Sequence, residues 1–294
     1  MDIKTLRYFL AVAREQSILG AAKSLHMTQP PLSRAMSELE ESLGKQLFLR
    51  GSRKITLTAD GLLLRKRASE IIDLMDKTEL EMTSVCKKDI YGEVSIGSGE
   101  AEVMTMAAKV IAEIRLDYPG IRFNLHTGNA NDVSERLDSG LLDFGILISP
   151  AEISKYNSIK LPSKATWGFA LPANDPIASQ NIITRNDIQN HSLIISQRLE
   201  IQNLLASWMK CAPEKLPISA TFDLIHNAAL LAKEGLGCVF TIDNLISGTI
   251  KDSSLVFRPL SPCVNSDIYL VWKRYQVFSK ASELFLERIR QELK

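Results

Sequence analysis

The sequence predicts a multidomain chain: an N-terminal all-α winged helix-turn-helix head, a long linker helix, and a two-lobed α/β region. The first part of the 294-residue chain is basic and the rest is mildly acidic. Residues 1–67 carry 12 Lys and Arg against 6 Asp and Glu, whereas the remainder carries 23 Lys and Arg against 28 Asp and Glu. Hydrophobic spacing also divides the chain, since helical periodicity in the first part gives way to alternating strands and helices. A basic head favours a phosphate-bearing partner, and a merely solvated basic surface is the alternative.

Composition places the chain among soluble globular proteins, with 45% hydrophobic and 23% charged residues. We find no apolar run long enough to cross a membrane and no secretory signal pattern, so we expect no membrane span. The four cysteines lie far apart and form no C-x-x-C pair, which favours a reducing cytoplasm. They are Cys86, Cys211, Cys238 and Cys263.

Motifs for catalysis or metal binding are not found in the sequence. The segment Gly97-Ser98-Gly99 begins like a dinucleotide fingerprint, but Glu102 stands where a third glycine belongs. The histidines fall in no metal-binding spacing, and in sequence no cysteine gathers beside them. We therefore expect no enzyme activity, no cofactor and no metal. The four histidines are His26, His126, His191 and His226.

The head is predicted to contain three helices. Residues 2–15 show a helical apolar stripe, Ser17 can cap a helix over 18–26, and Thr28 is a strong N-cap for a helix that Gly44 ends. Pro30 and Pro31 fall in the first turn of that third helix, where their missing N–H groups do no harm. The apolar stripe of the first helix is Ile3, Leu6, Phe9, Leu10 and Ala13, and that of the third is Leu32, Met36, Leu39 and Leu43.

Two helices joined by a tight turn indicate a helix-turn-helix, whose second helix reads the major groove through its N-terminal residues. The start of the third helix presents short polar side chains and one forked cation, which suit base edges and phosphates. Residues 46–58 then predict a hairpin wing whose cationic tip would meet the sugar–phosphate backbone; an ordinary exposed turn is the alternative. The candidate DNA-binding residues are Thr28, Gln29, Pro30, Ser33, Arg34, Ser37, Arg50, Arg53 and Lys54.

The run from Phe9 to Leu64 resembles LysR-type transcriptional regulators in both residue type and spacing. It departs from the family at Asp60, where alanine is usual. The resemblance implies a double-stranded DNA operator, a small-molecule effector, and tetramers built from dimers. The matching positions are Ala21, Ala22, Gln29, Pro30, Ser33, Arg34, Leu47, Phe48, Arg50, Arg53, Leu57, Thr58 and Gly61.

Residues 59–88 predict one long helix with an apolar seam whose members alternate four and three residues apart. A seam on a helix that projects from a small head is most simply buried against a second copy, so we expect a homodimer. The alternative is that the seam packs on the body of the same chain. The seam residues are Leu64, Ala68, Ile71, Met75, Thr78, Met82 and Val85.

The body beyond the predicted linker at residues 87–92 alternates strands and helices, which predicts parallel sheets. Predicted strands lie at 93–97, 119–126, 141–148, 167–171, 193–196, 218–222, 236–241 and 267–275, and predicted helices at 101–117, 132–139, 199–209, 224–233 and 279–293.

The body resembles the LysR-type effector domain, most clearly in residues 226–246, although Ile242 stands where proline is frequent. This resemblance implies the fold of type 2 periplasmic binding proteins, with two lobes joined by two crossing strands and a small-molecule site between them. The predicted domains are a DNA-binding head at 1–58, a linker helix at 59–88 and an effector region at 89–294, with lobe 1 at about 91–161 and 265–294 and lobe 2 at about 162–264.

Ligands of parallel sheets bind at the carboxyl ends of strands, often on helix N-termini, which places the effector site. Arg198 favours an anion, but Glu100 and Asp223 would favour a zwitterion or cation if both point inward. A solute-binding or catalytic α/β protein is the rival class. The effector-site candidates are Ser98, Gly99, Glu100, Thr127, Gly128, Asn129, Ser196, Gln197, Arg198, Phe222 and Asp223.

Overall fold

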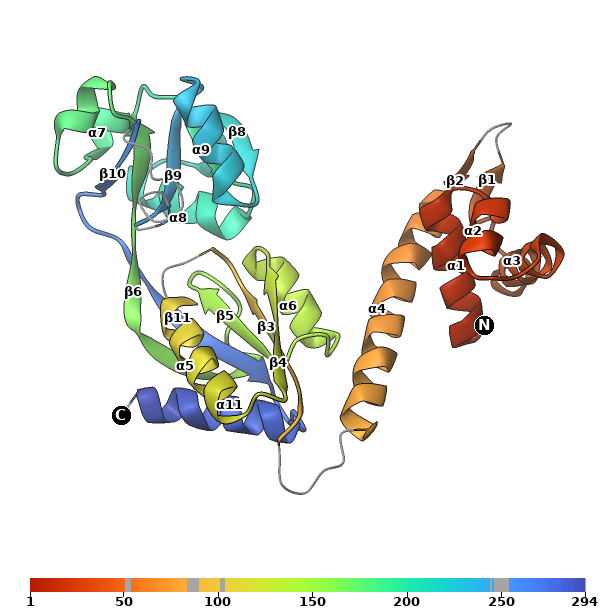
Figure 1. Cartoon of the computed structure of the whole chain (residues 1–294). Helices are drawn as coiled ribbons and strands as arrows, with labels where there is room; N and C mark the ends of the chain where they lie inside the picture. The colour runs from red at the N-terminus through yellow and green to blue at the C-terminus, as the bar shows by residue number, and fades with distance from the viewer. Residues whose placement is uncertain (51–53, 84–89, 101–103, 244, 246–253, 294) are drawn as a thin grey trace. The chain divides into compact units, whose positions relative to one another are not determined.

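The structure is a computed structural model that describes residues 1–50, 54–83, 90–100, 104–243, 245 and 254–293. The chain forms two compact units, Met1–Val85 and Cys86–Lys294. Each unit is visible in Figure 1, and each has its own hydrophobic core.

The first unit contains α1 (Ile3–Glu15), α2 (Ile18–Ser24), α3 (Gln29–Leu43), the antiparallel strands β1 (Phe48–Arg50) and β2 (Ile55–Leu57), and α4 (Ala59–Thr83). Three helices followed by a β-hairpin are the order of elements that a winged helix-turn-helix requires. Arg53 of the predicted wing tip lies outside the described residues.

Side-chain caps fix the first two helices. The Asp2 carboxylate accepts from the Thr5 N–H at 2.7 Å, and the Ser17 hydroxyl accepts from the Gly20 N–H at 3.2 Å. Thr28 occupies the N-cap position of α3, but within the described head its hydroxyl makes no capping bond. The prediction of a strong Thr28 cap is therefore wrong, and the two prolines in the first turn favour this start instead. Gly44 ends α3 as predicted, in the left-handed conformation with φ of 62°.

The core of the head forms where α1, α2 and α3 meet the wing. Phe9 is fully buried, and its ring centroid lies 5.3 Å from that of Phe48 at the start of β1. Ala21 is also fully buried, and its small side chain allows close packing of α2. Leu43 is 39% exposed, so the buried stripe of α3 ends four residues earlier, at Leu39.

Helix α4 divides its apolar side chains between two environments. Leu64, Ala68 and Ile72 join the core of the head, because α1 packs along α4 and Arg7 pairs with Asp76 at 2.5 Å. The prediction that the head leaves the seam uncovered is therefore wrong for the seam's first two residues. Further along, the helix exposes apolar side chains, and the part of the predicted seam at Met82 and Val85 lies outside what can be described. The exposed side chains beyond Ala68 are Ile71, Leu74 and Met75, and Leu62 and Leu63 near the start of α4 are exposed as well.

The second unit is built on a sheet with two halves. In the first half β3 (Gly92–Ser98) lies between the parallel strands β4 (Ile121–Thr127) and β5 (Phe144–Ile148). The helices of this half are α5 (Met104–Asp117), α6 (Ala130–Asp138) and α11 (Lys280–Glu292).

In the second half β7 (Leu193–Ser196) lies between the parallel strands β8 (Ile218–Phe222) and β9 (Cys238–Ile242). β10 (Leu255–Pro259) is antiparallel to β6 (Tyr156–Pro172). The helical segments are η1 (Pro176–Ser179), α7 (Arg185–Ile188), α8 (Leu199–Met209), η2 (Pro213–Lys215) and α9 (Ile225–Lys233).

Two long antiparallel strands connect the halves, namely β6 and β11 (Asn265–Lys273). β6 pairs with β11 along its first part and with β9 and β10 along its last part, and Figure 1 shows it running through both halves. The prediction of parallel sheets is therefore wrong for the crossing strands and for β10, although each half keeps three parallel strands. A chain that crosses between the halves and returns must reverse direction, which periodicity alone does not reveal.

Candidate functional sites

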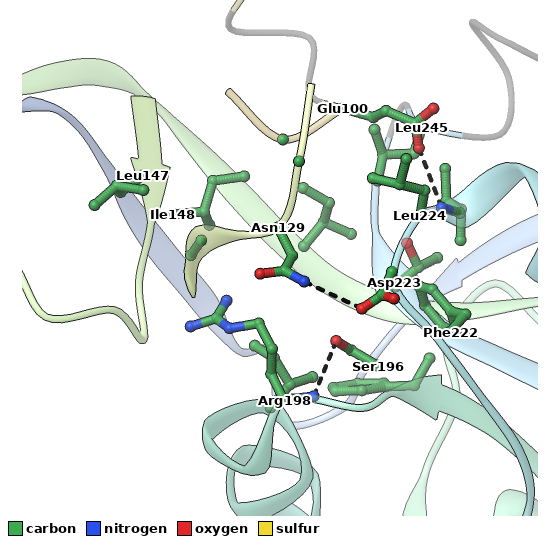
Figure 2. A pocket seen from close by; sticks show the side chains of 18 of the residues that line it. Glu100, Asn129, Leu147, Ile148, Ser196, Arg198, Phe222, Asp223, Leu224 and Leu245 are labelled. Atoms are coloured by element: carbon green, nitrogen blue, oxygen red, sulfur yellow. Dashed lines mark hydrogen bonds between the residues drawn. The ribbon is translucent and has the colours of Figure 1, made fainter. Parts of the chain in front are cut away.

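A cavity of about 130 Å³ lies at the carboxyl ends of the parallel strands of both halves (Figure 2). Eight of the eleven predicted effector-site residues line it. From the first half come Gly99, Glu100, Gly128 and Asn129, and from the second half come Ser196, Arg198, Phe222 and Asp223.

The other three predicted residues do not line the cavity. The Ser98 side chain is buried and its hydroxyl donates to the carbonyl of Gly99 at 2.7 Å, while the side chains of Thr127 and Gln197 are exposed. Successive side chains at a strand end point to opposite faces, so a neighbour of a lining residue need not line the cavity.

Apolar walls complete the cavity, and hydrophobic patterning alone does not distinguish them from core residues. Trp167 of β6 stacks on Phe240 of β9, with ring centroids 4.9 Å apart and planes 22° apart. Both rings come from apolar strands that read as ordinary core positions. The further lining residues are Ala130, Ile146, Leu147, Ile148, Ile201, Leu224, Ile225, Thr241, Ile242 and Leu245.

Arg198 places a buried cation beside this apolar space. It occupies the N-cap position of α8, and its side chain is 9% exposed. One terminal nitrogen donates to the carbonyl of Pro150 at 2.6 Å, whereas Nε has no hydrogen-bond partner among the described residues. The nearest carboxylate is that of the half-exposed Glu200, 3.7 Å from Nε. Burial lowers the pKa of Arg198, and the negative charge of Glu200 opposes this shift.

Both acidic residues of the cavity already accept hydrogen bonds from the opposite half (Figure 2). Glu100 accepts from the backbone N–H of Ile225 at 3.1 Å, at the start of α9. Asp223 accepts from the side-chain amide of Asn129 at 3.1 Å and from that of Gln197. The bonds of Glu100 and Asn129 join the two halves across the cavity and also satisfy the two carboxylates.

The predicted DNA-reading face of α3 is exposed on the head. Gln29, Pro30, Arg34 and Ser37 are exposed, and Ser33 is partly buried. The Arg34 side chain is 83% exposed, with Nε 3.8 Å from the Glu38 carboxylate on the next turn. Thr28 and Lys54 are also exposed, whereas the side chains of Arg50 and Arg53 lie outside the described part of the head.

A second cluster of polar side chains lies away from the cavity, in the second half of the effector region. Potential ligand atoms of Asp175, His191 and Cys238 all lie within 4.8 Å of one another. Folding therefore places a cysteine beside a histidine that is far from it in sequence, which the lack of a metal-binding spacing does not reveal.

None of the helices in the described ranges is both long enough and apolar enough to cross a bilayer.

Comparisons with known proteins match both units. Residues 3–62 match the family model described as "Bacterial regulatory helix-turn-helix protein, lysR family", and residues 88–294 match "LysR substrate binding domain". The regulator YvbU of Bacillus subtilis (strain 168) is 27% identical over 293 residues, covering 99% of this chain and 98% of YvbU. YybE of the same organism is 34% identical over 198 residues, which are 67% of each chain.

Solved structures share the fold. The crystal structure of CbnR, a LysR family transcriptional regulator, has a TM-score of 0.76 at 19% identity, with both chains fully covered. Full-length CbnR complexed with its target DNA has a TM-score of 0.74, also at 19% identity, and covers 99% of each chain.

A helix-turn-helix head joined to a two-lobed effector-binding domain defines a transcriptional regulator rather than an enzyme. This chain belongs to the LysR family of bacterial transcriptional regulators, as its sequence resemblance predicted. The predicted fold class and the predicted DNA-binding, effector-modulated function are confirmed at the level of the family.

Proposed function

We propose that the effector of this regulator is a small organic anion with an apolar body, bound in the cavity through Arg198. The observation that carries this proposal is a guanidinium with 9% exposure whose Nε lacks a hydrogen-bond partner in the described structure. A carboxylate would supply the missing charge-assisted hydrogen bond in a medium where such bonds are strong.

The two acidic residues that line the cavity do not require a positively charged group on the effector, so an anion is favoured over a zwitterion or a cation. Glu100 and Asp223 already accept hydrogen bonds from Ile225 and Asn129, so their negative charge is partly compensated before any ligand arrives. The rings of Trp167 and Phe240 offer contact to an apolar body. A volume of about 130 Å³ favours a metabolite smaller than the ligands of typical pockets of about 300–1,000 Å³.

The hydrogen bonds between the two halves of the effector region could couple effector binding to DNA binding. A ligand that contacts Arg198 and shifts Asn129 from Asp223 would change the placement of the two halves. Such a change alters operator binding only if the effector has different affinities for the two arrangements.

The head would read its operator in the major groove through the start of α3, with Lys54 on the backbone. The exposed apolar side chains of α4 around Ile71 and Leu74 support homodimerisation through this helix, and two paired heads would match two half-sites. A tetramer of such dimers and a cytoplasmic location complete the proposal, on the family resemblance.

The decisive test pairs charged ligands with neutral analogues. The full-length protein is titrated with butyrate, hexanoate and benzoate, and with the primary amide of each, while thermal unfolding is measured. We expect at least one carboxylate to stabilise the protein and its amide to do so far less. Arg198→Met should weaken carboxylate binding about 10- to 100-fold, since a charge-assisted bond contributes about 1.5–3 kcal/mol.

Arg258→Met is the matched control, because this cation belongs to the same half but donates from Nε to the carbonyl of Ala178. It should bind the carboxylate as the wild type does. Equal stabilisation by acid and amide, or equal loss in both variants, would refute the assignment of an anion to Arg198.

A further inference from the structure

The cluster of Asp175, His191 and Cys238 joins three separate segments of the second half. Asp175 precedes η1, His191 lies between α7 and β7, and Cys238 is the first residue of β9. Their potential ligand atoms lie within 4.8 Å of one another, and His191 Nε2 is 3.5 Å from an Asp175 oxygen. Three chemically different ligands therefore converge from parts of the chain that only the fold brings together.

The three side chains match the donor set of zinc. Imidazole nitrogen, thiolate sulfur and carboxylate oxygen bind Zn²⁺ at about 2.0–2.3 Å, so tetrahedral ligands lie about 3.5 Å apart. The ligand atoms, now up to 4.8 Å apart, would have to approach one another by at most about 1.3 Å to reach that spacing. Hard cations such as Mg²⁺ prefer all-oxygen sites and are disfavoured by the thiol and the imidazole.

Two further features describe the surroundings of these side chains. His191 Nδ1 is buried and has no hydrogen-bond partner in the described structure, which is costly for a polar atom. One oxygen of Asp175 accepts from the Ile177 N–H at 3.0 Å, which orients the carboxylate. The side chains of His191 and Asp175 are 29% and 17% exposed, so an ion has a path from solvent to the buried sulfur.

The state of the thiol argues against a redox role. Burial, and secondarily the carboxylate of Asp175, raise the pKa of Cys238 to about 12, so the free thiol is protonated at neutral pH. A protonated, buried thiol is a poor nucleophile and resists oxidation, unlike the exposed thiolates of redox sensors. A bound metal ion changes this balance, because a coordinating thiol is deprotonated outright.

We propose that Asp175, His191 and Cys238 form a Zn²⁺ site with three protein ligands, which links the segment before η1 to strands β7 and β9. The site lies at the amino-terminal edge of these parallel strands. Ile242 at the other end of β9 lines the effector cavity, four residues or about 13 Å away. The zinc site is therefore separate from the proposed effector site and depends on different residues.

Metal binding to the full-length protein tests this site directly. Protein freed of metal with a chelator is titrated with Zn²⁺ by calorimetry, and with Co²⁺ by absorption, where a thiolate-to-cobalt charge-transfer band reports sulfur ligation. We expect a single tight equivalent of Zn²⁺, little heat with Mg²⁺, and a clear Co²⁺ band.

Two ligand variants and two cysteine controls make the result specific. Cys238→Ala, which removes only the sulfur atom, should abolish the Co²⁺ band and weaken Zn²⁺ binding at least 10-fold. His191→Gln, at a partly exposed position, should weaken Zn²⁺ binding by a similar factor. Cys211→Ala and Cys263→Ala should bind both metals as the wild type does.

Circular dichroism shows whether each variant is folded. If one of the two ligand variants does not fold, the other is enough to test the site. Zinc affinity that is unchanged in a folded ligand variant overturns the proposal. A Co²⁺ band that is absent in the wild type, or that disappears in Cys263→Ala but persists in Cys238→Ala, overturns it equally.

Discussion

The head and the cavity of the second unit each contain an arginine to which we assign a binding role, and the two arginines differ in how far solvent reaches them. The Arg34 side chain on α3 is 83% exposed, whereas that of Arg198 beside the cavity is 9% exposed. A DNA duplex reaches only what projects from the surface, and salt screens such contacts. A small effector can be enclosed, and there an ion pair is stronger and less sensitive to salt. We therefore expect operator binding to fall steeply with salt and effector binding to change little.

The largest expected effect comes from a variant of α4 that should impair DNA binding but leave effector binding intact. Replacing Ile71 and Leu74 together by Glu should dissociate the proposed dimer, because it puts two charges on an apolar contact that contributes about 1.5–3 kcal/mol per buried side chain. Sedimentation should show a monomer, and operator affinity should fall more than 10-fold as one half-site is lost. Carboxylate binding in the cavity should remain.

Leu116→Glu is the matched control, since this leucine of α5 is 83% exposed in the other unit. It should leave both sedimentation and operator affinity unchanged. A double variant of α4 that still sediments as a dimer would show that the subunits pair elsewhere.

A smaller effect is expected at the DNA-reading face. Arg34→Ala should weaken binding to the specific operator by about 1–3 kcal/mol, the contribution of one good base contact. Fluorescence anisotropy with DNA from beside the gene, against random competitor, measures this loss. Arg122→Ala removes an exposed cation of the other unit and should have no effect; retained operator affinity in Arg34→Ala would refute the assignment of the reader.

The smallest effect is expected at the wing. Lys54→Ala should weaken binding to all sequences about equally, because a backbone contact carries no sequence information. The slope of log affinity against log salt should decrease in magnitude by about one. Changed sequence preference with an unchanged slope would contradict a backbone role for Lys54.

Local signals predicted several elements closely. Helix α3 begins near its two prolines and ends at Gly44, as predicted. The helix predicted at 199–209 is α8 (Leu199–Met209). Caps, glycines and apolar periodicity act within a few residues, so they can be read directly from sequence. Eight of the eleven residues predicted for the effector site also line the cavity, because the ends of strands are local features of the sequence.

Long-range packing explains the failures. The prediction at 167–171 recognised only the last part of β6 (Tyr156–Pro172), since nothing local shows that a strand crosses between two halves. Ala68 was assigned to a dimer seam, yet α1 buries it within the head. An apolar stripe specifies that a face will be covered, but it does not specify by which neighbour.

By itself, the sequence determined the order of the parts, the exposed polar start of α3 and the family, because these depend on short-range pattern and residue identity. Only the tertiary structure decided that Glu100 and Asp223 accept hydrogen bonds while Nε of Arg198 has no hydrogen-bond partner in the described structure, and that His191 lies close to Cys238. Whether a charge is compensated depends on which groups lie within a few ångströms of it. Those groups come from segments that the chain brings together only when it folds.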